Sequence, residues 1–184
     1  IDYLADQRDA TGVVPDDRTI VVERFRDEIG DWRLCILTPW GAAVHAPWAM
    51  AIGQRAAQEW GVELDAMWAD DGIVVRLPDA IDDPGPGLWA IDVGDLDELV
   101  VDAVPSTAMF AARFRECAAR ALLLPRRRPD RRTPLWQQRQ RAADLLQVAS
   151  RHPEFPMLLE TTREVMRDVF NLDALRELLT KVAD

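Results

Sequence analysis

The hydrophobic pattern of this chain changes its period about halfway along, and this change limits the possible folds more than any other feature. Up to about residue 77, short β-branched and aromatic segments alternate with turn residues, which is typical of strands joined in hairpins. Beyond about residue 90, apolar residues recur every three or four positions, which is typical of helices. The chain is therefore expected to be α+β, with strands first and helices after.

The first half is expected to hold two hairpins with a helix between them. The expected elements are strands at 19–26 and 32–38, a helix at 43–60, and strands at 64–69 and 73–77. The dipeptide Asp71-Gly72 is a strong tight-turn signal for the second hairpin. A helix at 2–10, stopped by Gly12, precedes these elements. Together they predict a ββαββ lobe.

The second half is expected to be a helical bundle. Helix starts are predicted from capping-type residues at Asp95, Ser106, Thr133 and Asn171. The loop at 82–87 is rich in proline, glycine and aspartate, so it breaks the periodicity between the halves. We therefore expect a mixed β/α lobe at 1–90 and a helical lobe at 91–184, both parts of one accessory domain.

Composition limits the classes of protein to which the chain can belong. It has 184 residues, of which 48% are hydrophobic and 29% charged, an ordinary globular balance. The net charge of −10 argues against a free-standing nucleic-acid-binding domain, which is usually basic. There is no apolar run of about 20 residues and no signal peptide, so no membrane partner is expected. Cys35 and Cys117 lie far apart in apolar contexts, which fits a reduced, cytoplasmic setting.

The chain opens on Ile1 within helix-like sequence, and we interpret it as a fragment of a larger protein.

No catalytic motif is visible. The sequence contains no GxxxxGK[ST] phosphate loop, no GxGxxG, no HExxH and no CxxC. The only histidines, His45 and His152, are interpreted as helix-end or surface residues. The aspartates between 79 and 102 lack the spacing of a calcium loop and are interpreted as solvated. No catalytic, cofactor-binding or metal-binding residue is therefore predicted in this chain.

Seven tryptophans invite a comparison between base stacking and core packing. Trp48, Trp60 and Trp68 lie in apolar periodic patterns and are expected in the core. Trp32 follows a charged turn and Trp40 lies in a Pro-Trp-Gly loop, so these two are the candidates for stacking on a nucleic acid. Core packing is the alternative for both.

Basic residues near Trp32 are candidates for phosphate contacts. Arg24 and Arg26 alternate along one strand and therefore share a face, which Arg33 joins if the register of the hairpin allows it. The alternative is a solvated face on which these arginines pair with nearby acids.

An arginine run is the strongest local charge signal. The segment PRRRPDRRTP at 125–134 contains Arg126, Arg127, Arg128, Arg131 and Arg132. A phosphate-contacting loop at a helix start is one interpretation, because the helix dipole adds to the arginines. A solvated linker, or ion pairs with the acids of the chain itself, is the other.

Several long stretches resemble the Lhr family of large helicase-related proteins of superfamily 2. These are DRTIVVERFRDEIGDWRLCILTPWGAAVHAPWAMAI (17–52), MWADDGIVVRLPD (67–79), FAARFRECAARALLLPRRRP (110–129) and TPLWQQRQRAADLLQVASRHPEFPMLLETTREVMRDVF (133–170). They cover nearly the whole chain in the same order.

The resemblance implies a position in a larger machine. In that family, two RecA-like domains bind ATP with Mg, a winged-helix domain follows, and this chain resembles part of the next domain. The family moves 3′ to 5′ on single-stranded DNA and unwinds duplexes, with RNA–DNA hybrids favoured in some members. ATP and Mg belong to the parent protein and not to any residue here.

The resemblance therefore implies a non-catalytic accessory domain of an ATP-dependent helicase of the DNA-repair type, which helps to form the single-strand channel next to the RecA-like motor. Its expected partners are the RecA-like and winged-helix domains and a single strand of DNA or an RNA–DNA hybrid. The alternative is a structural or protein-interaction module that braces the motor without touching nucleic acid. A metal-dependent nuclease is disfavoured, because the chain has no pattern of metal ligands.

Overall fold

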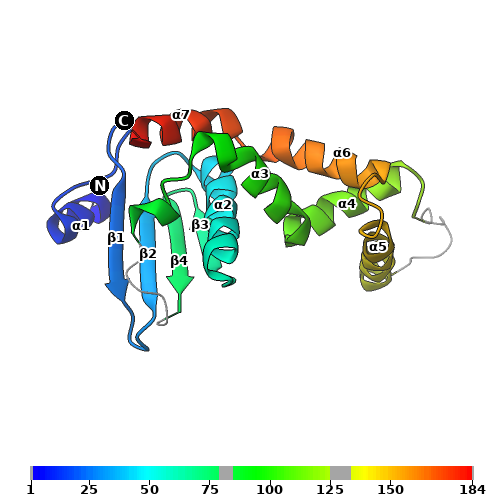
Figure 1. The fold of residues 1–184 in the computed structure, drawn as a ribbon, viewed down its shortest axis with the longest axis horizontal. Coiled ribbons are helices and arrows are strands. Elements are labelled where there is room, and N and C mark those ends of the chain that lie inside the picture. Colours follow the sequence, from blue (N-terminus) through cyan, green and yellow to red (C-terminus); the bar gives the residue numbers. More distant parts are fainter. Residues whose placement is uncertain (1, 79–84, 125–133, 184) are drawn as a thin grey trace. The chain divides into compact units, whose positions relative to one another are not determined.

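The fold is described from a computed structural model, which describes residues 2–78, 85–124 and 134–183. Its contacts divide the chain into two compact units. Unit 1 comprises residues 1–100 and 170–184, and unit 2 comprises residues 101–169. The α+β class is confirmed, with the strands early in the chain and most helices after them (Figure 1).

Unit 1 is built on a four-stranded antiparallel sheet of order β1-β2-β4-β3. The strands are β1 (Val21–Arg26), β2 (Trp32–Leu37), β3 (Asp65–Ala69) and β4 (Gly72–Leu77). Both expected hairpins are present, because β1 pairs with β2 and β3 pairs with β4. The central strands β2 and β4 join the hairpins, with Leu34 opposite Val75 and Ile36 opposite Ile73. These four side chains are buried, since alternate residues of a strand share one face.

Helix α2 (Ala42–Trp60) packs against β3 and β4 and supplies the other side of this core. Trp48 is fully buried and its indole nitrogen donates a hydrogen bond to the carbonyl of Trp89 at 2.8 Å. Helix α7 (Leu172–Ala183) packs against α2, and Asn171 donates its backbone N–H to the carbonyl of Ala43 at 2.9 Å. Unit 1 also contains α1 (Asp2–Thr11), the short helix η1 (Pro86–Leu88) and most of α3 (Val93–Ala103).

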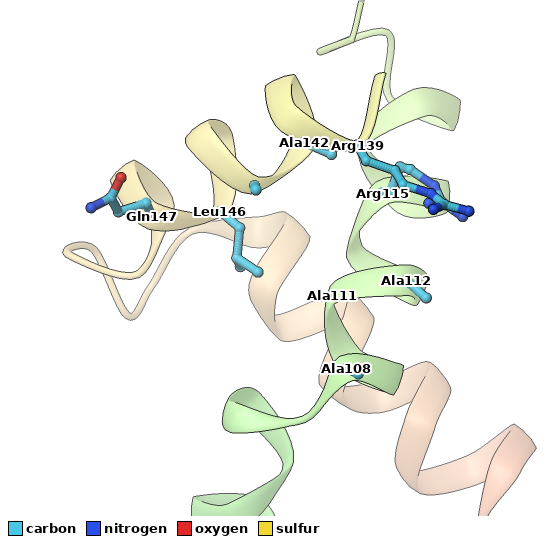
Figure 2. A pocket seen from close by; sticks show the side chains of 9 residues that line it. Ala108, Ala111, Ala112, Arg115, Arg139, Ala142, Leu146 and Gln147 are labelled. Atoms are coloured by element: carbon cyan, nitrogen blue, oxygen red, sulfur yellow. The ribbon is translucent and has the colours of Figure 1, made fainter. Parts of the chain in front are cut away.

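Unit 2 is helical. It contains η2 (Val104–Ser106), α4 (Ala108–Arg120), α5 (Leu135–Ala149), α6 (Pro156–Glu164) and the π-helical turn η3 (Val165–Val169). Both α5 and α6 pack against α4, whose buried residues are Phe110, Phe114, Cys117 and Ala118. A groove between α4 and α5 remains open (Figure 2).

The division between units differs from the boundary expected at 90/91. Two ion pairs tie α3 to unit 1, one from Arg55 to Asp95 at 2.9 Å and one from Arg176 to Asp97 at 2.5 Å. The last helix, α7, also belongs to unit 1 because it packs on α2. Both features depend on contacts between residues distant in sequence.

Three local expectations are corrected. The second turn consists of Asp70 and Asp71, and Gly72 already belongs to β4. Gly72 is needed for its small size, because a Cβ atom there would collide with the carbonyl of Ile36. Thr107 rather than Ser106 caps α4 by accepting a hydrogen bond from the N–H of Phe110 at 3.1 Å.

The third correction concerns α3, which begins at Val93, so Asp95 lies inside its first turn. The carboxylate of Asp92 accepts from the N–H of Gly94 at 2.7 Å. The expected caps at Asn171 and Thr133 have different outcomes: Asn171 accepts from the N–H of Ala174 at 3.1 Å, and Thr133 lies outside the described residues.

Two tryptophans expected in the core are exposed. Trp60 is 39% exposed because it is the last residue of α2, and Trp68 is 41% exposed on the edge strand β3. Within the described part of the chain, no helix is long and apolar enough to span a bilayer.

Candidate nucleic-acid interface

The first hairpin brings three of the predicted residues together, and we call Arg24, Arg26 and Trp32 the hairpin cluster. Arg26 lies directly opposite Trp32 in the β1–β2 register, so the two side chains share one face of the sheet. The Cζ atom of Arg26 lies 4.5 Å from the centroid of the Trp32 ring, and that of Arg24 lies 5.8 Å from it. Both distances are within the range of cation–π attraction.

The Trp32 side chain is partly buried. Its burial lies between the core packing and the projecting position that the sequence left as alternatives. Trp32 lies opposite Leu77 of β4, a fully buried core residue. Its indole Nε1 is buried and has no hydrogen-bond partner in the described part of the structure. Two guanidinium groups lie over the ring, so Trp32 acts as a support for them.

Arg33 does not join the hairpin cluster. The register places Arg33 opposite Phe25, on the other face of the sheet, where its Nε donates to the carboxylate of Asp27 at 2.9 Å. Although partial burial opposes it, hydrogen bonds from the N–H of Ile29 and from Arg33 lower the pKa of Asp27. The nearby Arg76 forms a similar pair with Asp31 at 2.6 Å. On this face both Arg33 and Arg76 are paired with acids, and the Arg33–Asp27 pair is one of those that the alternative interpretation expected.

Trp40 lies elsewhere in unit 1, on a turn held by a buried histidine. His45 is fully buried rather than a surface residue, and its Nδ1 lies 2.7 Å from the carbonyl of Ala69. A carbonyl oxygen only accepts, so Nδ1 carries the proton and Nε2 accepts from the hydroxyl of Thr38 at 2.6 Å. The same hydroxyl oxygen accepts from the N–H of Trp40 at 3.3 Å. This network fixes the backbone that carries Trp40.

Three residues that sequence analysis missed lie near Trp40. The Nζ atom of Lys181 lies 5.9 Å from the Trp40 ring, and both residues line a hollow of about 280 Å³ with Trp89 and Arg18. Lys181 is 141 positions from Trp40 in the chain, so no local pattern connects them. This hollow contains aromatic rings and cations, but Asp16 and Asp17 also line it and balance its charge.

The arginine run lies outside the described residues. Its five members are Arg126, Arg127, Arg128, Arg131 and Arg132. Their choice between phosphate contacts and ion pairs stays a prediction.

The described residues include no group of three or more His, Cys, Asp or Glu side chains placed to hold a metal ion. Both cysteines are free, and burial is the main cause that raises the pKa of the Cys117 thiol.

The α+β fold with its arginine–tryptophan hairpin can be compared with known proteins. The family described as DEAD/H associated matches residues 14–184, and the chain belongs to this family.

More specific relatives are Lhr helicases. The chain is 53% identical, over 98% of its length, to a Mycolicibacterium smegmatis protein named Lhr helicase/probable uracil glycosylase. It is 50% identical, over 97% of its length, to the Escherichia coli Lhr helicase/uracil glycosylase. In each case it spans 12% of the relative. The Lhr resemblance is therefore confirmed for a segment of these long proteins.

A solved structure agrees. The structure of Mycobacterium smegmatis helicase Lhr bound to ssDNA and AMP-PNP matches with a TM-score of 0.88 and 52% identity, over 98% of this chain and 23% of that chain.

Proposed function

We propose that this chain is a non-catalytic accessory domain of an ATP-dependent helicase and forms part of the path of a single strand of DNA or of an RNA–DNA hybrid. One observation carries the proposal, namely the match over 98% of the chain to a helicase whose structure was solved with single-stranded DNA. The hairpin cluster supplies the chemistry, because arginine guanidinium groups bind phosphates and aromatic rings support them.

The proposed role of the hairpin cluster is to hold two cations toward the strand. Arg26 donates from Nη1 to the carbonyl of Gly30 at 2.7 Å, and its guanidinium lies over Trp32. A guanidinium fixed in this way loses less conformational entropy when it binds a phosphate than a freely rotating one. A base that stacks on Trp32 has to displace one of the arginines, so phosphate contact is the first role of this surface.

In this proposal, ATP and Mg bind RecA-like domains elsewhere in the parent protein, next to a winged-helix domain. The accessory domain affects the coupling between ATP hydrolysis and strand separation. It contributes no group to phosphoryl transfer.

The alternative function is a structural or protein-interaction module that braces the motor. The neutralised face of the sheet favours it, because Arg33 and Arg76 are both paired with acids there. The net charge of −10 also favours it.

The test uses Arg24→Ala and Arg26→Ala in the intact helicase. Each variant is expected to reduce the slope of log affinity against log salt by about one unit, since each removes one phosphate contact. Unwinding should weaken while DNA-stimulated ATP hydrolysis is largely retained. The matched control is Arg33→Ala, which changes an arginine on the opposite face of the sheet and should leave the slope unchanged. Slopes equal to that of the unmodified helicase in all three variants would favour the bracing module.

The variant Trp32→Ala distinguishes two roles of this side chain, which are support of the Arg24 and Arg26 guanidinium groups and packing in the core. The variant should weaken unwinding. It should also lower the free energy of unfolding of the 184-residue chain by less than the about 3–5 kcal/mol that is typical of a fully buried tryptophan, and thermal melting measures this change. A fall of that full size would show that Trp32 is mainly a core residue and would remove it from the proposed interface.

A further inference from the structure

The groove between α4 and α5 has a volume of about 650 Å³ and an apolar lining. Its lining residues are Ala108, Ala111, Ala112 and Arg115 of α4 and Arg139, Ala142, Ala143, Leu146 and Gln147 of α5. Five of these nine residues are alanines, so the backbones of the two helices are reachable by another element. Only Ala142 and Ala149 of α5 are buried, so this helix leaves most of its surface uncovered.

Two arginines line the groove and determine which charge an occupant should carry. Figure 2 shows Arg115 from α4 and Arg139 from α5 extending in the same direction. Neither forms an ion pair with any residue in the described ranges, whereas neighbouring arginines of unit 2 do. Arg113 pairs with Glu116 at 3.2 Å and Arg163 with Glu160 at 3.0 Å. Two like charges that line one groove, with no ion-pair partner among the described residues, favour an occupant that supplies carboxylates.

The same lining disfavours a nucleic-acid strand. Strand-binding grooves combine cations with aromatic rings on which bases stack. None of the described residues that line this groove is aromatic, and its alanine side chains offer no hydrogen-bond donor to phosphates. Alanine faces instead allow close approach of a helix, as at packed helix pairs where small residues set the distance between axes.

The apolar surface continues beyond the groove on α5. Leu135 is four residues before Arg139 and seven before Ala142, so helical spacing places it on the same face. Its side chain is 62% exposed. An element that lies along α5 would therefore cover Leu135 together with the groove.

We propose that the groove receives an amphipathic helix of the same polypeptide, with apolar side chains toward the alanines and carboxylates toward Arg115 and Arg139. This rests on the proposed function, in which the chain is one domain of a longer helicase; the bacterial relatives are about eight times as long, since the chain spans 12% of each. The occupant thus belongs to the remainder of the protein and fixes unit 2 against it.

The experiment places a photo-crosslinking amino acid at position 143 in the purified full-length helicase, with position 141 as the control. Ala143 is exposed and lines the groove, while Arg141 is exposed on the same helix and does not line it. Irradiation is expected to join position 143, but not 141, to one peptide of the same molecule that combines apolar residues with Asp or Glu. Peptide mass spectrometry identifies the site.

Charge and volume changes then test the mechanism. The double variant Arg115→Glu, Arg139→Glu should reduce the crosslink yield by about tenfold or more, because it places like charges together. Reversal of the carboxylates in the crosslinked peptide to arginine should restore the yield. Arg141→Glu should have no effect. Ala111→Trp, at an exposed lining position, fills the groove without requiring burial and should also abolish the crosslink.

Crosslinks to DNA, to a second copy, to a separate protein, or no product at position 143 would each overturn the inference. A yield unchanged by the double charge reversal would do the same. The failure of the proposed function is a separate outcome, because salt slopes that stay unchanged in Arg24→Ala and Arg26→Ala would exclude the strand contact whether or not position 143 crosslinks.

Discussion

Trp32 and Trp40 are held in different ways, although both were candidates for the same role. Trp32 lies in a strand, and two guanidinium groups lie over its ring. Trp40 lies in a turn, where its backbone N–H donates to the Thr38 hydroxyl that is bonded to His45. Gly41 follows Trp40 with a φ of +82°, a left-handed conformation that favours glycine and lets the chain enter α2 directly. The backbone of the turn is therefore held by hydrogen bonds that do not involve the Trp40 side chain.

The buried Thr38–His45 pair should be important for stability. Thr38→Val keeps the shape of the side chain but removes the proton that His45 Nε2 accepts, and it also removes the acceptor of the Trp40 N–H. A buried polar atom left unpaired costs about 1–3 kcal/mol, so the free energy of unfolding should fall by about that amount. Urea denaturation of the 184-residue chain measures it.

Thr180→Val is the matched control, because Thr180 is exposed on α7 and bonds only to the carbonyl of Arg176 in its own helix. Its effect should stay within about 0.5 kcal/mol. Equal losses in both variants would show that the buried network contributes nothing specific.

At the scale of elements, hydrophobic periodicity predicted the sheet and most helices. The β-branched and aromatic residues at 19–26 and 32–38 placed both strands of the first hairpin within two residues of their observed bounds. The N-cap residue of α4 was harder to predict, since Ser106 and Thr107 are adjacent hydroxyl residues that both make good caps. Only the packing of α4 decides between them. The face of Arg33 depended on the register of the hairpin, which the 27–31 turn sets through Asp27.

Asp27 organises that turn and should make the stability of the hairpin depend on pH. Its carboxylate accepts from the N–H groups of Ile29 at 3.0 Å and Asp31 at 3.1 Å and from Arg33. The folded-state pKa is lowered below the ordinary 3.8, so the contribution to stability is present above that value. It is lost as the pH falls through the lower folded-state pKa, because protonation then removes the negative charge to which Arg33 and the two N–H groups are bonded.

Asp27→Asn should therefore lower the urea midpoint at neutral pH and flatten its decline below about pH 4. Asp173→Asn is the control, because that carboxylate is 98% exposed and should leave the midpoint nearly unchanged. Parallel pH profiles for Asp27→Asn and the unmodified chain would contradict the assigned role of Asp27.

At the scale of the whole molecule, sequence analysis predicted the class of fold and the family but not the grouping of helices into units. Helix α7 follows unit 2 in the chain, yet it packs on α2, and Asn171, just before it, bonds to Ala43 at the start of α2. Local helix propensity cannot predict that α7 packs on α2, because this contact depends on which apolar faces remain uncovered once the sheet has formed. The hollow lined by Trp40 and Lys181 escaped prediction for the same reason, since it forms only when α7 returns.

The division of labour proposed for the parent helicase gives a direct prediction for this chain. The sequence contains no phosphate loop, so the 184-residue chain should neither bind nor hydrolyse ATP with Mg, with or without single-stranded DNA. The full-length protein should hydrolyse ATP, and the rate should rise when single-stranded DNA is added. A phosphate-release assay on both proteins at equal concentration makes the comparison. Hydrolysis by the short chain that single-stranded DNA stimulates would place catalytic groups within it and would overturn its assignment as an accessory domain.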